Sequence, residues 1–519
     1  GRSFKGQLCM VVLFRILRRN RHPNVIDGEL WSKVIQIILV LYENLLISPD
    51  IIPKVEQGPK LGDIKKPTPE ILIKKARETK GILSAFASYL KGDEEPTEDE
   101  IEASIKASQC IASSNIASSV FGNEANVTED LIKTLLSSIK VEKTTENTRF
   151  FESEMLFLVE LSVTLHFPYN QQEKVVSLIL KKVSELSQVT GLSKTTLGRL
   201  MTCRLLLFSA VTNQESLLLE LINKDLLEKN EIFTQKFFTS DTGSEVLNQI
   251  LNLAESGYYR VHLLQDAGFW KLLRSSPVMK GHAREVYLFL ENSLLKSTGT
   301  LTDKNFMWVL GLLDEISSAG ALGSRWENEY DKLLRKGQKV DKENPFQDIV
   351  ELSLKSVNIT SRLLEEDVTS FKLSKSETIA VIQALAHQCL NPCQQVRSYS
   401  LETLEVAIKE KIELPSDEIA TVEEIIEGGL LPLLESTATK QVSNVAVPKI
   451  LAVISNFYLH CLRKGITTND TFLKVLNIFN KYVDMPSVEN QLQELITEKK
   501  QIEAGAVKAD AISTDTAES

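Results

Sequence analysis

Residues that interrupt helices are scarce in this chain. Only 23 Gly and 15 Pro occur among 519 residues, and the apolar–polar alternation typical of strands is close to absent. A hydrophobic content of 43% and a charged content of 25% are ordinary for a folded protein. We therefore predict an all-α fold. Because 519 residues are too many for one core, we expect roughly three to four domains or one solenoid.

Cysteines and long apolar runs are also few. The six Cys lack paired local spacing, which favours reduced thiols in a cytosolic compartment over a disulfide framework. No stretch of about 18 residues is both apolar and uncharged, so we predict that nothing here spans a bilayer. Without a secretory signal in view, we interpret three Asn-x-Ser/Thr triplets as chance; they begin at Asn126, Asn358 and Asn469.

The sequence also lacks the common catalytic motifs. It contains no Gly-x-Ser-x-Gly elbow, no His-Glu-x-x-His and no glycine-rich dinucleotide fingerprint. Residues 191–196 resemble only the end of a phosphate loop, without its glycines or preceding strand, so we interpret them as a helix N-terminus. The sequence therefore predicts no enzyme activity for this stretch and no cofactor.

Two groups of His and Cys residues are candidates for metal or nucleophilic sites. His387, Cys389 and Cys393 lack the fourth ligand and the paired short spacings of a closed zinc site, which favours core packing. His460 and Cys461 are adjacent, and their side chains diverge by about 100° on a helix. We predict no metal site and no nucleophile–base dyad.

Charge is distributed unevenly along the chain. The net charge of −10 argues against nucleic acid as a partner. Residues 1–80 carry a balance of +7, whereas the remainder carries −17. A basic first part could face an anionic membrane or an acidic partner, and the alternative is an uneven solvated surface.

The opening of the chain predicts a helical hairpin. Segments 4–18 and 29–47 are largely apolar, and the polar segment between them contains Pro23 and Gly28. Segment 4–18 is apolar on all sides, which is typical of a helix sandwiched between neighbours. One hairpin cannot bury its own apolar surface, so we expect others to stack beside it, as in an α-solenoid.

Four arginines accompany this hairpin. They could contact phospholipid or a GTPase, or they could be helix C-terminal cations that favour the helix dipole. The candidate contact residues are Arg15, Arg18, Arg19 and Arg21.

Helix pairs recur roughly every 40 to 45 residues, the spacing of HEAT or armadillo units. We predict three helical blocks, 1–146 with an acidic linker at 91–100, 147–343 and 344–504, followed by a disordered tail at 505–519. Helix starts are indicated by Thr97, Thr242 and Ser374, each followed three residues later by Glu, and by the Asn344–Gln347 stretch. The expected helices are 70–90, 97–121, 128–139, 149–161, 170–187, 193–210, 215–227, 242–253, 258–273, 283–295, 304–317, 374 onward, 395–411, 416–434, 445–462 and 471–483.

Three stretches, in order, resemble one family. The first is Gly28-x-x-Trp31-x-x-Val34-Ile35-x-x-Ile38-x-x-Leu41, the second is Phe151-x-x-Glu154-Met-Leu, and the third is Gln395-Val-Arg-Ser-Tyr-Ser-Leu401-x-x-Leu404 with Leu430–Leu434. They resemble the three homology regions downstream of the exchange domain in the large Golgi Arf guanine-nucleotide exchange factors. Ser48, where proline is common, and Gln394-Gln395 depart from that pattern.

The resemblance implies a function for the parent protein and a different one for this stretch. The parent would load Arf with GTP at the Golgi, while these regions would serve membrane recruitment, GTPase recognition and regulation. Arf and Rab-type small GTPases and the Golgi membrane surface are the implied partners, and the implied location is cytoplasmic and peripheral to Golgi membranes. The exchange domain with its catalytic glutamate is absent from this sequence, as are the upstream regions to which the family's dimerisation is attributed.

The chain begins Gly1-Arg-Ser-Phe without an initiator Met, and we expect it to be a fragment of a larger protein. The alternative function is that of a cargo-binding transport receptor or a vesicle-coat adaptor, since both are helical-repeat proteins. A third possibility is an unrecognised hydrolase, for which the sequence offers no converging polar residues.

Overall fold

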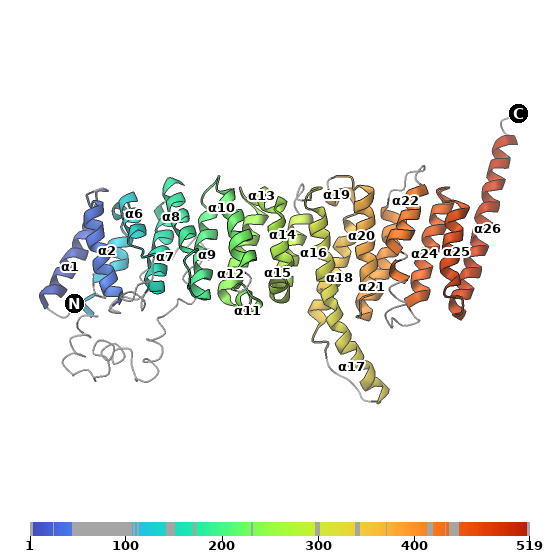
Figure 1. Ribbon diagram of the computed structural model, residues 1–519, viewed down its shortest axis with the longest axis horizontal. Coiled ribbons are helices and arrows are strands. Elements are labelled where there is room, and N and C mark those ends of the chain that lie inside the picture. Colours follow the sequence, from blue (N-terminus) through green and yellow to red (C-terminus); the bar gives the residue numbers. More distant parts are fainter. Residues whose placement is uncertain are drawn as a thin grey trace. The chain divides into compact units, whose positions relative to one another are not determined.

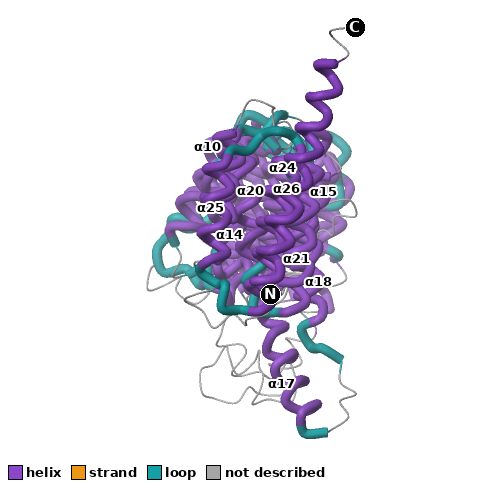
Figure 2. The backbone as a smooth tube through the Cα atoms, turned by 90° about the vertical axis from the view of Figure 1, so that its right-hand side faces the viewer, coloured by secondary structure: helices purple, strands orange, loops and turns teal. Residues whose placement is uncertain are grey.

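The computed structural model describes residues 4–23, 25–43, 106, 109–111, 114–141, 151–169, 173–229, 232–295, 301–337, 343–369, 371–412, 419–430, 432–434 and 446–515. Within these ranges the chain is helical and contains no strand (Figures 1 and 2), which confirms the all-α prediction. The predicted helix at 70–90, the acidic linker at 91–100 and the start of the helix expected at 97–121 lie outside the described residues.

The chain folds into two compact units, residues 1–263 (unit 1) and 264–519 (unit 2). Each unit consists of helices that stand side by side as successive hairpins (Figure 1), the arrangement of an α-solenoid. The division into blocks at 146/147 and 343/344 remains a prediction. The elements of unit 1 are α1 (Phe4–Arg19), α2 (Gly28–Glu43), η3 (Ala117–Phe121), η4 (Glu124–Asn126), α6 (Glu129–Ser137), α7 (Phe151–Tyr169), α8 (Glu173–Leu186), α9 (Lys194–Phe208), α10 (Glu215–Glu220), η5 (Leu221–Glu228), α11 (Gln235–Phe238) and α12 (Asp241–Glu255), and α13 (Arg260–Gln265) contains the boundary.

Unit 1 alternates fully buried helices with half-buried ones. Every residue of α9 from Thr196 to Phe208 is buried, because neighbours cover all its sides. Helix α8 buries one face, formed by Val175, Val176, Ile179, Leu180, Val183 and Leu186, and exposes Lys174, Lys181 and Glu185. This confirms the amphipathic helix predicted for that segment.

Two arginines of α9 are buried as ion pairs. Arg199 pairs with Glu160 of α7, its Nε lying 2.5 Å from Oε1. Arg204 Nη1 lies 2.5 Å from Oδ2 of Asp225 in η5, and the other Asp225 oxygen accepts from Gln188 at 2.9 Å. A buried charge requires such a partner, so these pairs fix how α9 meets its neighbours.

Unit 2 consists of α14 (Ala267–Arg274), α15 (Ser276–Leu295), α16 (Phe306–Ala319), η6 (Gly320–Leu322), α17 (Gly323–Arg335), α18 (Gln347–Arg362), α19 (Glu366–Thr369), α20 (Lys375–Gln388), α21 (Gln394–Val406), η7 (Ala407–Lys411), α22 (Ile419–Glu424), η8 (Ile425–Leu430), α24 (Ala446–Arg463), α25 (Asn469–Asn480) and α26 (Pro486–Asp515). Helices α16 and α18 approach closely, because Ser356 and Ser353 of α18 donate to the carbonyls of Leu313 (2.8 Å) and Ile316 (3.2 Å). Helix α17 extends away from the other helices of unit 2 (Figures 1 and 2).

Helix caps account for several element boundaries. Ser374 and Glu377 form the predicted capping box of α20. The box predicted at Thr242 is wrong, because α12 begins two residues earlier and Ser240 Oγ accepts from Gly243 N at 3.2 Å. The box predicted at Asn344–Gln347 is also wrong, because Asn344 Oδ1 accepts from Phe346 N at 2.9 Å and α18 begins only at Gln347.

Two of the longer helices, α17 and α26, have no counterpart in the sequence prediction. The backbone of α26 runs to Asp515, through most of the segment whose composition predicts a disordered tail. That segment contains several alanines, which have the highest helix propensity. No helix among the described residues is long and apolar enough to cross a membrane.

Candidate functional site

The candidate site lies on the α1–α2 hairpin of unit 1. Helix α2 turns its apolar side inward, burying Trp31 completely and Ile35 and Ile38 almost completely, and it packs on α6. Asp27 caps α2 by accepting from Leu30 N at 2.9 Å. Both helices predicted at the start of the chain are present; α1 ends at Arg19 and α2 is described from Gly28 to Glu43, so the predicted end of the second helix at residue 47 lies outside the described residues.

Three asparagines hold the C-terminus of α1. Asn123 Nδ2 donates to the carbonyls of Leu17 (2.9 Å) and Asn20 (2.8 Å). Buried Asn126 donates to Leu17 O at 3.0 Å and to Val120 O at 3.2 Å, and it accepts from Asn20 Nδ2 at 2.9 Å. We call Asn20, Asn123 and Asn126 the asparagine clamp. It satisfies carbonyls that a helix end otherwise leaves without partners.

The four predicted contact residues lie around this clamped end. Arg15, Arg18, Arg19 and Arg21 are all exposed. None of them forms an ion pair or side-chain hydrogen bond with another residue in the described ranges. Arg18 and Arg19 occupy the last turn of α1, where a cation favours the helix dipole. Whether they serve the dipole or a ligand remains a prediction.

Apolar side chains share the surface with the arginines. Leu8, Val12 and Ile16 are 53%, 49% and 61% exposed. Because each residue advances about 100° around a helix, these three side chains fall on one arc with Lys5, Arg15 and Arg19. We call these six residues the outer face of α1.

The outer face corrects one sequence prediction. The sequence predicts that α1 is sandwiched on all sides, whereas only its opposite side, with Phe14 and Leu17, is buried among the described residues. The recurrence of basic residues on the Leu8–Ile16 arc is the signal that indicates an exposed face. An arc of Leu, Val and Ile among Lys and Arg is typical of interfacial helices.

The stretch that resembles a phosphate loop is a helix N-terminus, as predicted. Gly191 has φ of +79°, and Ser193 Oγ caps α9 by accepting from Thr196 N at 3.2 Å. The carboxylate of Glu152 already occupies the position of an anion there, since it accepts from Ser193 N at 3.1 Å and from the Thr196 hydroxyl at 2.5 Å.

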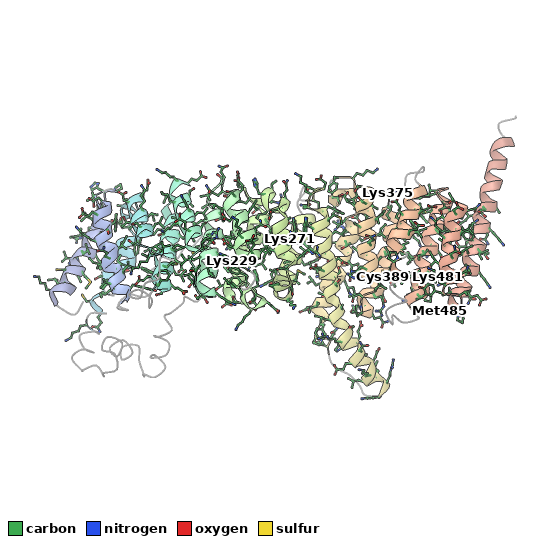
Figure 3. The ribbon with its side chains drawn as sticks, in the orientation of Figure 1. Lys229, Lys271, Lys375, Cys389, Lys481 and Met485 are labelled. Carbon is green, nitrogen blue, oxygen red and sulfur yellow. The ribbon has the colours of Figure 1, made fainter. Side chains whose placement is uncertain are left out.

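The His387, Cys389 and Cys393 side chains serve separate contacts in unit 2. Cys389 (Figure 3) and Cys393 are fully buried, and burial raises the pKa of both thiols. Cys393 Sγ lies 3.2 Å from Glu327 of α17, whereas exposed His387 lies 3.0 Å from Asp314 of α16. The core-packing interpretation is confirmed for the two cysteines. The described part of the chain holds no cluster of three or more metal-ligating side chains.

The His460–Cys461 pair is also structural. Burial raises the pKa of Cys461 to about 12, so the thiol stays protonated at neutral pH. Burial, with nearby Lys464, Lys409 and Arg463, lowers the pKa of His460. A protonated buried thiol is a poor nucleophile. That the pair is no nucleophile–base dyad stays a prediction.

Comparison with known proteins relates the whole chain to one group. Residues 378–500 match the family described as "GBF1-like, tetratrico peptide repeat region". The chain is 52% identical over 505 residues to ARF guanine-nucleotide exchange factor 2 of Saccharomyces cerevisiae, covering 97% of this chain and 34% of the relative. It is 41% identical over 507 residues to ARF guanine-nucleotide exchange factor 1 of the same yeast, covering 97% of this chain and 36% of the relative. The chain thus spans about a third of the length of these relatives.

Proposed function

The chain belongs to the family of the ARF guanine-nucleotide exchange factors, and from this premise we propose that it is a non-catalytic region that recruits such a factor to Golgi membranes and regulates it there. The outer face of α1 is the observation that carries the proposal. Its arginines are attracted to anionic lipid headgroups, and Leu8, Val12 and Ile16 can enter the boundary between headgroups and acyl chains.

The partners follow from the family and from the solenoid. The relatives are named for acting on ARF, so we propose Arf GTPases as partners of the parent protein, with Rab-type GTPases meeting the exposed helix faces. The parent would be cytoplasmic, peripheral to Golgi membranes and dimeric through regions outside this chain. No specific observation favours the alternative of a transport receptor or a coat adaptor.

Vesicle flotation of the full chain tests membrane recruitment. We expect wild type to float with phosphatidylcholine–phosphatidylserine vesicles and to stay behind with phosphatidylcholine alone. The double variant Val12→Ser/Ile16→Ser and the double variant Arg15→Ala/Arg19→Ala should each lose flotation. Leu288→Ser, a substitution of another exposed apolar side chain on α15, is the matched control. Equal flotation of wild type and both double variants would contradict the proposal.

A nucleotide-exchange assay tests the absence of catalysis. We place exchange activity in the two thirds of the relatives' length that this chain does not cover. The chain should therefore leave the rate of nucleotide release from an Arf GTPase at its intrinsic value. Acceleration comparable to that of a complete exchange factor would refute this assignment.

A further inference from the structure

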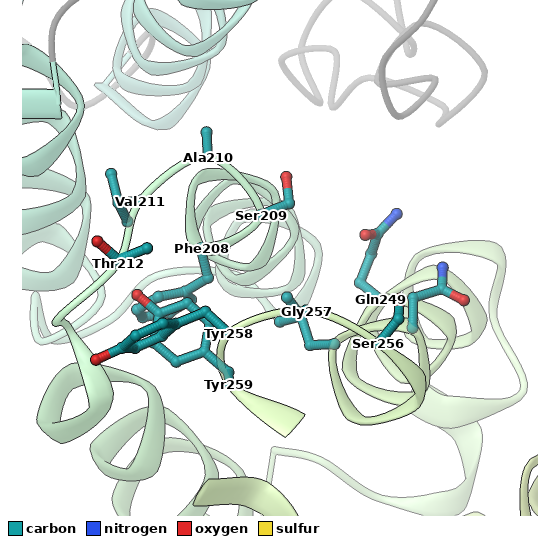
Figure 4. Close-up of a pocket in the computed structure, with 12 residues that line it drawn as sticks. Phe208, Ser209, Ala210, Val211, Thr212, Gln249, Ser256, Gly257, Tyr258 and Tyr259 are labelled. Carbon is teal, nitrogen blue, oxygen red and sulfur yellow. The ribbon is translucent and has the colours of Figure 1, made fainter. Parts of the chain in front are cut away.

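A cavity of about 640 Å³ opens in unit 1 where α9 and α12 both end. It is lined by residues 208–212, by Gln249, Asn252 and Leu253 of α12, and by residues 256–259. Figure 4 shows residues 208–212 on one side and Gln249 on the other. We call this cavity the α9–α12 cup. Its volume lies within the range of about 300–1,000 Å³ that is typical of ligand sites.

The floor of the cup is apolar and firmly packed. Phe208, Val211, Leu253 and Tyr259 line it and are almost completely buried. The rings of Phe208 and Tyr259 meet edge to face, with centroids 5.5 Å apart. Because these side chains are held by the core, the shape of the cup is set before any ligand arrives.

Three polar side chains around the cup donate hydrogen bonds to acceptors of the protein itself. The Thr212 hydroxyl donates to Glu173 Oε1 at 3.0 Å, and the Ser209 hydroxyl donates to Leu206 O at 2.6 Å. Gln249 Nε2 donates to Glu245 Oε1 at 2.7 Å. The Ser209 hydroxyl oxygen and the Gln249 carbonyl are the acceptors that these side chains offer to a ligand, whereas the Thr212 hydroxyl oxygen also accepts from Asn213 Nδ2 at 3.2 Å. Asn252 and Ser256 add both donors and acceptors.

The backbone also supplies hydrogen-bond acceptors and negative charge to the cup. Helices α9 and α12 each have 15 residues, and both end there, at caps Ser209 and Ser256. The C-terminus of a helix carries a partial negative charge of about half an electron, from carbonyls without partners inside the helix. Two such ends together repel anions and attract a cation that donates hydrogen bonds.

An aromatic ring stands at the rim. Tyr258 is 43% exposed and lines the cup, and its hydroxyl donates to Glu215 and lies 2.9 Å from Asn213 Oδ1. The ring also stacks against His262, with centroids 5.7 Å apart, and the His262 Nε2 lies 3.9 Å from Glu215. The hydrogen bond to Glu215 raises the pKa of Tyr258.

We propose that the α9–α12 cup binds an arginine side chain within an extended segment of a partner protein. A guanidinium has five donors and no acceptor, it is always charged, and its plane stacks on aromatic rings. These properties match the acceptors of the cup, its two helix C-termini and Tyr258. The cup is separate from the outer face of α1, so this inference goes beyond the proposed membrane role.

The test uses the full chain and a short peptide, acetyl-Gly-Gly-Arg-Gly-Gly-amide, titrated by saturation-transfer NMR. A peptide with citrulline in place of arginine has nearly the same shape without the charge. We expect the arginine peptide to bind at least about tenfold more tightly than the citrulline peptide, since only the former offers a charged donor set. Equal affinity of the two peptides would overturn the proposal.

Substitutions then assign the binding to the cup. Tyr258→Ala should weaken it about tenfold through loss of the ring. Gln249→Lys should weaken it and Gln249→Glu should strengthen it, and such opposite directions cannot come from misfolding. Leu178→Ala, on the exposed side of α8, is the control and should bind like wild type. Wild-type affinity in both Tyr258→Ala and Gln249→Lys would refute the assignment.

Discussion

At the scale of single residues, the hydrogen bonds of Asn126 could not be predicted from the residues beside it in the sequence. The interpretation of its Asn-x-Thr triplet as chance agrees with the structure, because the side chain is buried. Its partners come from two directions, Leu17 and Asn20 at the end of α1 and Ser119 and Val120 of η3. Local sequence cannot indicate such a role, since the partners at the end of α1 lie more than a hundred residues away.

Asn126→Ala should destabilise unit 1 by about 3 kcal/mol, because it leaves several buried polar groups without partners. Urea unfolding followed by circular dichroism measures the change, and hydrogen exchange should show faster exchange in α1. Asn469→Ala is the control, because Asn469 begins another such triplet and is exposed at the first turn of α25. Unchanged exchange in α1 would show that the clamp does not hold this helix.

The charge of Asp225 makes unit 1 sensitive to acid. Burial alone would raise the pKa of Asp225, but hydrogen bonds from Arg204, Gln188 and Lys229 outweigh it and hold this pKa below its ordinary value. A carboxyl whose pKa is lower in the folded state stabilises the fold fully above its ordinary pKa of about 4. That contribution is lost as the pH falls through the lowered pKa.

Asp225→Asn should therefore destabilise unit 1 by about 3–5 kcal/mol at pH 7, because it leaves the buried Arg204 charge unpaired. The difference from wild type should shrink as the pH falls from about 4 through the lowered pKa of Asp225, below which the folded protein also carries Asp225 in its neutral form. Urea midpoints across this pH range measure both effects. Glu220→Gln, which breaks an exposed ion pair with Lys224, should change stability by less than about 0.5 kcal/mol at any pH. A difference independent of pH would exclude Asp225 as the titrating group.

At the scale of elements, two backbone segments that pack closely together leave no space for a side chain at the position between them. A Cβ on Gly243 of α12 would lie 2.1 Å from the carbonyl oxygen of Phe237 at the end of α11. The turn between α11 and α12 is short, so neither backbone can move without disturbing Phe237 and Phe238, which are buried.

Gly243→Ala should accordingly destabilise unit 1 by about 3 kcal/mol or more. Gly428→Ala in η8 provides the contrast, because its nearest atom would be 3.8 Å away, and there alanine should stabilise by about 0.5–1 kcal/mol. In thermal unfolding, Gly243→Ala should lower the melting temperature relative to wild type and Gly428→Ala should raise it. Similar melting temperatures would contradict the packing described for α11 and α12.

The helices were largely predictable because each carries its own signal. Apolar spacing marks α8, and the Ser374–Glu377 box marks the start of α20. The start of α12 was not predictable in the same way, since Ser240 and Thr242 are both good caps and Phe237 decides between them by packing. Helix α17 is absent from the prediction although Trp326, Tyr330 and Leu333 have helical spacing.

The candidate sites were predictable only in part. The sequence indicated the four arginines but not that Leu8, Val12 and Ile16 share their surface, because exposure depends on which side of α1 the clamp and η3 cover. The α9–α12 cup has no sequence signal, since its residues come from the ends of two helices and from the turns that follow.

At the scale of the whole molecule, positive and negative charges are unevenly distributed along the chain. The first 80 residues carry a balance of +7 and the rest carries −17, and the outer face of α1 belongs to the basic part. Attraction of this part to anionic lipid is screened by salt, whereas insertion of apolar side chains is not.

Raising the salt concentration from about 50 mM to about 500 mM should therefore reduce flotation with phosphatidylserine vesicles by about tenfold. The variant Arg15→Ala/Arg19→Ala, whose flotation is already lost at about 50 mM salt, should show little further change, because much of the screened attraction is already gone. Flotation that does not respond to salt would assign membrane binding to apolar contacts alone.

The asparagine clamp also bears on how this protein can change over evolutionary time. It joins Asn20 to Asn126 and so closes the intervening chain into a loop. The entropic cost of closing such a loop grows only with the logarithm of its length. Doubling the length of the loop therefore adds only about 0.6 kcal/mol. A longer chain between the two asparagines should therefore have little effect on how firmly the C-terminus of α1 is anchored.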